Sequence, residues 1–81
     1  MKNGVVTHVH PTKGEFILQI DATGEYAVFE FLGGIHINVG DKLYGNLSAL
    51  GGDIFIHQSG TKFTAYGQTG PRSLRECLAF H

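Results

Sequence analysis

Apolar and polar residues alternate along two consecutive stretches near the start of the chain. The stretches cover residues 4–10 and 15–21, and the turn Pro11-Thr12-Lys13-Gly14 joins them. A period of two is typical of half-buried β-strands. It places Val5, Thr7 and Val9 on one face of the first strand, and Phe16, Leu18 and Ile20 on one face of the second. The opening therefore predicts a β-hairpin against which the later strands pack.

The alternation continues along most of the chain. Further strands are predicted over residues 25–32, 35–39, 42–50, 54–58 and 62–68. Turn signals recur at intervals of about eight to twelve residues, a rhythm typical of a sandwich or barrel. The chain is also too short for two self-sufficient cores. We therefore expect one domain, residues 1–81, folded as an all-β, OB-like small barrel of five or six strands.

The pattern also predicts which side chains face inward and where the chain turns. Gly33-Gly34 is a strong two-residue hairpin signal, Gly51-Gly52-Asp53 is read as a turn, and Gly45 within a strand suggests a bulge or a tight bend. The side chains expected to face inward are Ala27, Phe29, Phe31, the aliphatic residues of 35–39, Leu43, Leu47, Ile54 and Ile56.

The tail has a different pattern. Ser73-Leu74-Arg75-Glu76 matches a capping box, in which the Ser73 hydroxyl and the Glu76 carboxylate bond to free amides at a helix start. A short helix over about residues 73–80 would place Leu74, Cys77 and Leu78 on one side, for packing on the barrel or on a neighbour. A final strand through the same residues is the alternative.

Composition narrows the classes of partner and compartment. The net charge is −1 with histidine neutral, so no overall positive field draws the protein onto a polyanion. Cys77 is the single cysteine, which excludes an intrachain disulfide and suits a reducing compartment. The apolar runs are too short for a membrane span or a signal-peptide core. The sequence thus predicts a cytoplasmic protein that has no membrane partner.

Aromatic and imidazole rings gather on the faces predicted to point outward. They belong to His8, His10, Tyr26, His36, Tyr44, Phe55, His57 and Tyr66. Proteins that bind single strands use such rings to stack bases, while Lys and Arg follow the phosphates. The cations available for this are Lys13, Lys42, Lys62, Arg72 and Arg75. The alternative is that the rings only pack over their cross-strand neighbours, as on many sheets.

The stretch from Gly4 to Gly14, followed by Phe16-Ile17, resembles the first hairpin of cold-shock domains: a glycine, an alternating strand, a Thr-Lys-Gly turn and a Phe-Ile pair occur in that order. Gly24-Glu25, leading into the strand to Phe31, is similar to the family's third strand. The resemblance covers about the first third of the chain. It implies a five-stranded OB-type barrel that binds single-stranded RNA or DNA on the face of its second and third strands.

The family's binding positions carry over at Lys13 and Phe16, and more loosely at His8 and Phe31. The chain departs from the pattern elsewhere. His8 stands where the family has a stacking tryptophan, Glu30 stands where it has a histidine, and Glu15 alone replaces a glycine and an aromatic residue.

These observations predict single-stranded nucleic-acid binding through an outward face of aromatic and histidine side chains. The residues expected to bind are His8, Lys13, Phe16, Tyr26, Phe31, Tyr44 and His57. The alternative is a protein-interaction or homo-oligomerisation module, in which the same rings and the stripe Leu74, Cys77, Leu78 and Phe80 bury against another chain.

Metal binding and catalysis are the weaker hypotheses. His8 and His10 lie two residues apart on a strand and so could aim both imidazoles the same way, but a metal site needs a third ligand. Ser48, Ser59 and Ser73 show no identifiable base or orienting group. Cys77 is expected to be a small buried apolar residue rather than a nucleophile. We therefore expect no enzymatic activity, no cofactor and no metal.

Overall fold

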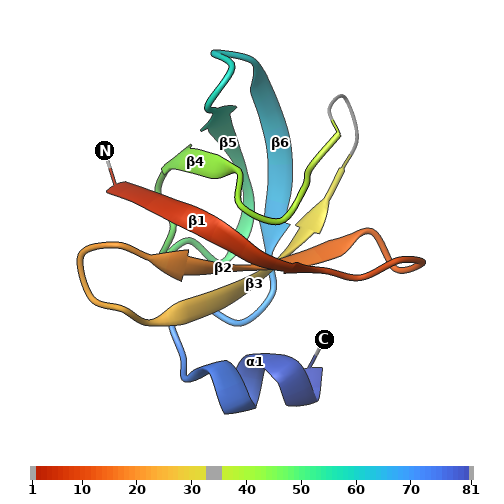
Figure 1. Cartoon of the computed structure of the whole chain (residues 1–81), viewed down its shortest axis with the longest axis vertical. Coiled ribbons are helices and arrows are strands. Elements are labelled where there is room, and N and C mark those ends of the chain that lie inside the picture. The colour runs from red at the N-terminus through yellow and green to blue at the C-terminus, as the bar shows by residue number, and fades with distance from the viewer. Residues whose placement is uncertain (1, 33–35, 81) are drawn as a thin grey trace.

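The described part of the chain forms six strands and one helix. The computed structural model describes residues 2–32 and 36–80 (Figure 1). The elements are β1 (Lys2–Val9), β2 (Glu15–Ile20), β3 (Tyr26–Phe31), β4 (Lys42–Gly45), β5 (Gly51–His57), β6 (Lys62–Gly67) and α1 (Leu74–Phe80). The strands close into a barrel in the order β1-β2-β3-β6-β5-β4, and their pairings are antiparallel. The prediction of a small, OB-like all-β barrel with a short C-terminal helix is confirmed.

Two three-stranded meanders make up the barrel, β1-β2-β3 and β4-β5-β6. After β3 the chain crosses to β4, which pairs with β1 on the other side of the ring. We call the described residues 36–41 of this connection the crossing segment. The second closure joins β3 to β6. A closed ring leaves no long edge strand whose backbone groups lack partners.

The strand predicted over residues 35–39 is not formed by the described residues 36–39. Ile37 reaches the core, whereas Val39 is exposed. The segment is instead held by a local turn, because the Asn38 amide donates to Asp41 Oδ2 at 3.0 Å. The chain meets β1 just after this segment, where the Gly40 amide donates to the Val6 carbonyl at 2.8 Å and the Val6 amide donates to the Asp41 carbonyl at 2.9 Å. The predicted Gly33-Gly34 turn lies outside the described residues.

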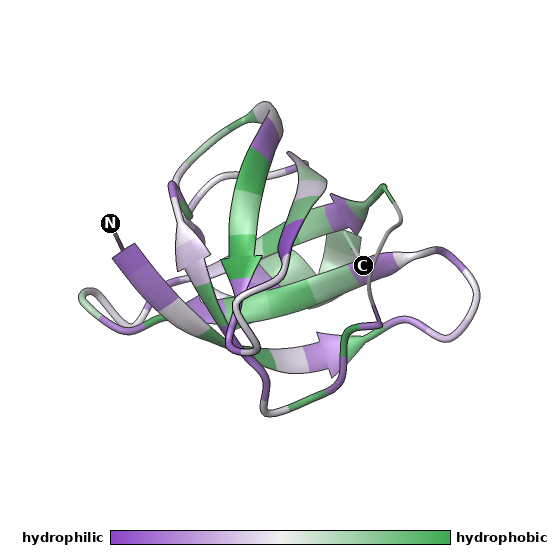
Figure 2. Cartoon of the chain, turned by 90° about the horizontal axis from the view of Figure 1, so that it is seen from above, coloured by the Kyte–Doolittle hydropathy of each residue, from purple (hydrophilic) through white to green (hydrophobic). Residues whose placement is uncertain are grey.

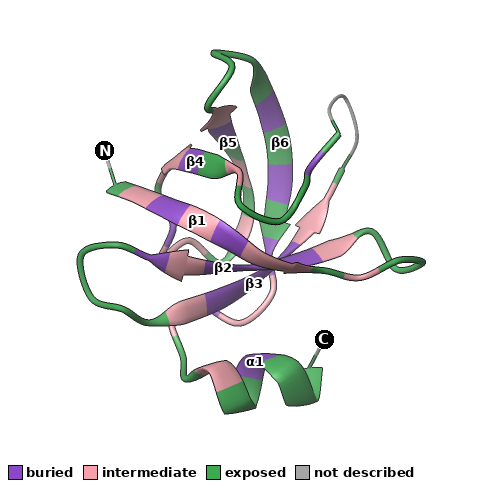
Figure 3. Ribbon diagram, viewed as in Figure 1, coloured by how far each residue is buried: buried purple, intermediate pink, exposed green. Residues whose placement is uncertain are grey.

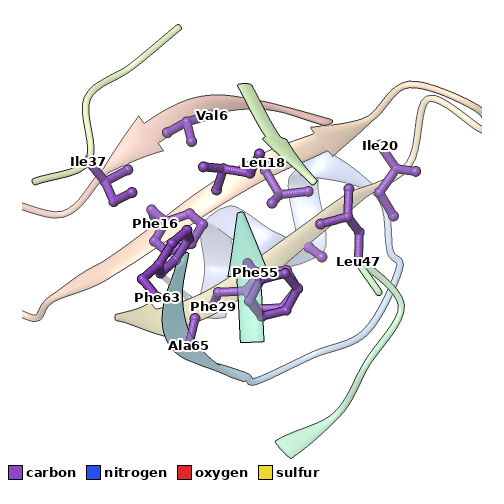
Figure 4. Packing of buried hydrophobic residues seen from close by; sticks show 12 residues of the cluster. Val6, Phe16, Leu18, Ile20, Phe29, Ile37, Leu47, Phe55, Phe63 and Ala65 are labelled. Atoms are coloured by element: carbon purple, nitrogen blue, oxygen red, sulfur yellow. The ribbon is translucent and has the colours of Figure 1, made fainter. Parts of the chain in front are cut away.

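The barrel interior is filled by aliphatic and aromatic side chains from every strand and from the crossing segment (Figure 4). Phe29 is central. Its ring stacks on that of Phe16, with 5.8 Å between the ring centroids, and makes an edge contact with the ring of Phe55, with 5.1 Å between the centroids. Phe55 continues the contact to Phe63 at 6.0 Å. The buried set is Val6, Phe16, Leu18, Ile20, Ala27, Phe29, Ile37, Leu43, Leu47, Phe55, Phe63 and Ala65. The inward positions predicted in β2 and β3 are confirmed, with Phe31 half-buried at the margin.

The predicted inward face of β1 is wrong. Gly4 and Val6 are the buried residues of this strand, while Val9 is exposed and Val5 is only half-buried. The register to β2 shifts between Val6 and His8. Such a bulge bends the strand and changes the direction in which side chains point, so one parity does not hold along the whole strand.

The parity predicted for β5 is also wrong, because Phe55 points inward and Ile54 is 61% exposed. Residues Gly51-Gly52-Asp53 are not a turn but pair with β6, and this register sets Phe55 opposite Phe63. β4 ends at Gly45 instead of running to Leu50. Gly45 has φ +149°, and a Cβ there would lie 2.6 Å from Phe55 Cδ1. Glycine therefore provides both the expected bend and the space for the Phe55 ring.

A second cluster lies on the outside of the barrel, where α1 covers β2 and β3 (Figure 1). Its fully buried members are Ile17, Val28 and Cys77, with Tyr26 and Leu74 packed beside them. Burial raises the pKa of the Cys77 thiol. Leu78, predicted on the packing side, is 47% exposed, because a helix of seven residues presents only a narrow stripe to the sheet.

The start of α1 is fixed by the predicted capping box. The Glu76 amide donates to Ser73 Oγ at 3.2 Å, and the Ser73 amide donates to Glu76 Oε1 at 3.4 Å. Hydrogen bonds from Ser73 lower the pKa of the Glu76 carboxyl. Tyr26 and Arg72 exchange two backbone hydrogen bonds of 2.7 Å each, which tie the chain before the helix to β3. In residues 2–32 and 36–80, no helix has the length and apolar character needed to span a bilayer.

Candidate nucleic-acid interface

Phe16 does not belong to any outer surface. Its side chain is 2% exposed and stacks on Phe29 inside the barrel. Phe31 packs partly against the same core and retains some exposure at the end of β3. The core assignment thus holds for Phe16, and only Phe31 combines a core contact with an accessible ring.

The outer face of β2 and β3, which the cold-shock resemblance implies as the binding surface, is covered by α1. Ile17 and Val28 are fully buried there beneath Cys77. Tyr26 packs against the same cluster and is half-buried. A nucleic acid could reach this face only if the helix moved away.

The remaining predicted rings lie far apart around the barrel. Tyr44 is on β4 and Tyr26 is on β3, and three pairings separate these strands in either direction around the ring. Figure 3 shows the two strands on different sides of the barrel. The outward rings therefore do not form one continuous patch, and the prediction of a single aromatic face at these positions is wrong.

His57 is held in a hydrogen-bonded position at the end of β5. Its Nε2 lies 2.8 Å from Asp41 Oδ2, and the two side chains are 11% and 13% exposed. On the other side of the ring, Nδ1 accepts a hydrogen bond from the Ser59 amide at 3.1 Å. Because the side chain is only 11% exposed, little of the ring face is accessible for stacking, and the contacts of the ring join β5 to the crossing segment.

Desolvation acts to raise the pKa of Asp41, but hydrogen bonds from His57 and the Asn38 amide, with the nearby His57 and His36 rings, outweigh it. The pKa of the Asp41 carboxyl is therefore lowered from its ordinary value of 3.8. The carboxylate stays ionised in neutral and mildly acidic solution and holds the crossing segment against β5.

Ser59, for which the sequence shows no base, lies beside His57 in the structure. Its Oγ lies 2.9 Å from His57 Nδ1, so that Ser59, His57 and Asp41 form a chain like that of serine hydrolases. Acyl transfer also needs amides aimed at a developing oxyanion. The two nearest amides are already used: Ser59 donates to His57 Nδ1, and Gly60 donates to the His57 carbonyl at 2.8 Å. Ser59 Oγ also donates to Thr61 Oγ1 at 3.1 Å, so these contacts together hold the β5–β6 turn in place.

His8 and His10 are both engaged in local contacts. His8 Nδ1 lies 2.9 Å from Thr7 Oγ1, and His10 Nδ1 accepts the amides of Thr12 and Lys13 at 3.2 and 3.1 Å. The second pair of bonds shapes the turn between β1 and β2. The described residues contain no group of three or more side chains suited to a metal ion, so a third ligand for this pair is not found among them.

A cavity opens at the mouth of the barrel, beside the β1–β2 turn. It has a volume of about 140 Å³ and is lined by Val9, Gly14, Glu15, Phe16, Phe31, His36 and Ile37. Drug-sized ligands occupy larger pockets, about 300 Å³ or more, so this cavity fits one planar ring. Lys13 directly precedes Gly14 in the wall. Sequence patterns could not indicate the cavity, because its lining residues come from three strands, the β1–β2 turn and the crossing segment.

The negative charge near the mouth limits what it can bind. Glu15 and Glu30 are direct cross-strand neighbours on β2 and β3, and Glu15 Oε1 is buried with no hydrogen-bond partner among the described residues. Like charges placed opposite each other repel anions as well as one another. The cavity mouth therefore disfavours anionic groups.

Comparisons with protein-family models, with curated proteins and with solved structures gave no match for this chain.

Proposed function

We propose that the chain binds single-stranded nucleic acid weakly at the mouth of the barrel, with one unstacked base in the cavity between Phe31 and His36. The observation that carries this proposal is the ring-sized, largely apolar cavity next to the Lys13 turn. The resemblance of the first hairpin to cold-shock domains supports the same class of ligand.

The residues at the mouth set the expected strength and character of binding. Stacking of one base on an aromatic side chain contributes about 1 to 3 kcal/mol. Lys13 adds a phosphate contact, while Glu15 and Glu30 repel further phosphates. Each phosphate neutralised on a single strand adds about −0.7 to the slope of log K against log salt. We expect a slope of about −1 and an affinity no tighter than about 10 μM.

The test is a fluorescence-anisotropy titration with labelled oligo(dT) and oligo(U) at low and high salt. Phe31→Leu keeps an apolar side chain but removes the ring, so it should weaken binding about fivefold or more. Tyr44→Leu, the same loss of a ring on the opposite side of the barrel, should leave binding unchanged. Lys13→Ala should weaken binding and flatten the salt dependence. No anisotropy change at about 100 μM protein would refute the proposal.

A further inference from the structure

The outer face of β6 and its two neighbouring strands presents apolar side chains that no other described element covers. β6 alternates between exposed and buried residues (Figure 3), with Lys62, Thr64 and Tyr66 outward. The register to β5 sets these residues beside Ile56, Ile54 and Gly52 in turn. On the other side, Tyr66 pairs with Glu30, and the Leu32 amide donates to the Thr64 carbonyl at 3.2 Å.

These pairings define three rows across the sheet. The first row is Glu30, Tyr66 and Gly52, the middle row is Leu32, Thr64 and Ile54, and the third is Lys62 and Ile56. We call these residues the β6 face. Leu32, Ile54 and Tyr66 are 54%, 61% and 46% exposed. Three large apolar side chains gathered on one surface indicate an interaction site more strongly than the same residues scattered singly.

The charges on the β6 face determine which partner fits it. Glu30 lies in the first row and Lys62 in the third, and in the middle row between them Leu32 and Ile54 flank Thr64. A two-fold axis through the middle row would bring Glu30 of one copy opposite Lys62 of the other, twice in each dimer. In such an isologous interface a surface must complement itself. The β6 face does so in both its apolar centre and its charged ends.

We propose that this face binds a second copy of the chain, by two-fold packing of β6 on β6. The proposal does not depend on nucleic-acid binding. A standard interface buries about 800 Å² per partner, which is a large share of the 4368 Å² accessible surface of this chain. The β6 face comprises eight residues, fewer than the roughly 20 to 30 residues per side of a standard interface, so the dimer is weak and forms at micromolar to millimolar concentration.

The experiment is a sedimentation-velocity series on the full chain, from about 10 μM to 1 mM. The wild type should show a sedimentation coefficient that rises with concentration toward that of a dimer. Ile54→Lys places a charge in the middle row and should keep the protein monomeric throughout. Leu78→Lys makes the same kind of change at an exposed position on α1 and should leave association as in the wild type.

Thermal unfolding at low concentration checks that both variants are folded. Ile54→Lys should unfold close to the wild-type temperature, since its side chain is exposed. A wild-type protein that stays monomeric up to 1 mM, or an Ile54→Lys variant that is folded and associates like the wild type, would overturn the proposal. A Leu78→Lys variant that stays monomeric while Ile54→Lys associates like the wild type would assign the interface to α1 instead.

Discussion

Two outer faces of the barrel carry apolar residues, and the chain covers one of them. On the β2–β3 face, Ile17 and Val28 are fully buried beneath α1. On the β6 face, Leu32, Ile54 and Tyr66 remain exposed. Residues of the same chemistry thus become core in one place and surface in the other. Whether an outward apolar residue is buried or exposed therefore depends on whether another element of the chain covers it.

The path of the chain explains why α1 covers the first of these faces. After β6 the backbone runs back along β3, where Thr69 Oγ1 accepts the Val28 amide at 3.2 Å and Arg72 pairs with Tyr26. The helix therefore begins beside β3 and packs on β3 (Figure 1). Having only seven residues, it cannot also reach across β6 to β5.

The largest expected effect is a difference in the free energy of unfolding between truncations on the two faces. Ile17→Ala removes a fully buried side chain under α1 and should lower the free energy of unfolding by about 2 to 5 kcal/mol. Ile54→Ala removes the same atoms from the β6 face and should change it by less than about 0.5 kcal/mol. Urea denaturation at low concentration measures both. Equal losses would mean that the two faces do not differ in coverage.

A polar contact between His57 and Asp41 ties the end of β5 to the segment that leads into β4. Asp41→Asn removes the charge that binds His57, so we expect a loss of about 1 to 2 kcal/mol. His57→Gln should cause a loss of similar size if the same contact is broken. An effect of Asp41→Asn that persists fully in a His57→Gln background would show that the two side chains act separately.

The Asp41 contact should also depend on pH in a defined direction. Because the pKa of Asp41 is lowered in the folded state, its contribution is present above the ordinary value of 3.8 and is lost as the pH falls through the folded-state pKa. The stability difference between the wild type and Asp41→Asn should therefore shrink in acid below that value. A difference that grows in acid would contradict the assignment.

Removing the N-terminal cap of α1 tests how much the helix contributes to stability. Ser73→Ala removes the hydroxyl that accepts the Glu76 amide and should lower stability by about 1 kcal/mol. Ser48→Ala, a serine outside α1, serves as a control and should have a smaller effect. If the helix detaches, Cys77 becomes accessible, so Ser73→Ala should also label faster with a thiol reagent.

The fold could be predicted from the sequence further than the site could. Alternation in β2 and β3 and the capping box at Ser73 are local signals, and the structure confirms each. The β1 bulge and the entry of Phe55 into the core depend on register between strands distant in sequence, which alternation does not encode. Figure 2 shows hydrophobic residues along most strands, so hydropathy alone does not identify the face that the helix covers.

The surroundings of Tyr26 and His57 could not be predicted for the same physical reason. Tyr26 was assigned correctly to an outward position, but the helix that covers it is contributed by residues far along the chain. Alternation also predicts an outward ring at His57, whose partner Asp41 lies 16 residues away between two predicted strands. Neither the contact of Tyr26 with α1 nor that of His57 with Asp41 can be recognised from the local sequence pattern.

The most direct test of the β6 interface is to exchange its charges and then mix the variants. Glu30→Lys and Lys62→Glu each set like charges opposite one another across the two-fold axis, with little effect on the stability of the monomer. Sedimentation equilibrium should find each variant monomeric at concentrations where the wild type associates, and should find association restored both in the double variant and in an equimolar mixture of the two single variants. Single variants that associate like the wild type, or a mixture that remains monomeric, would contradict the account.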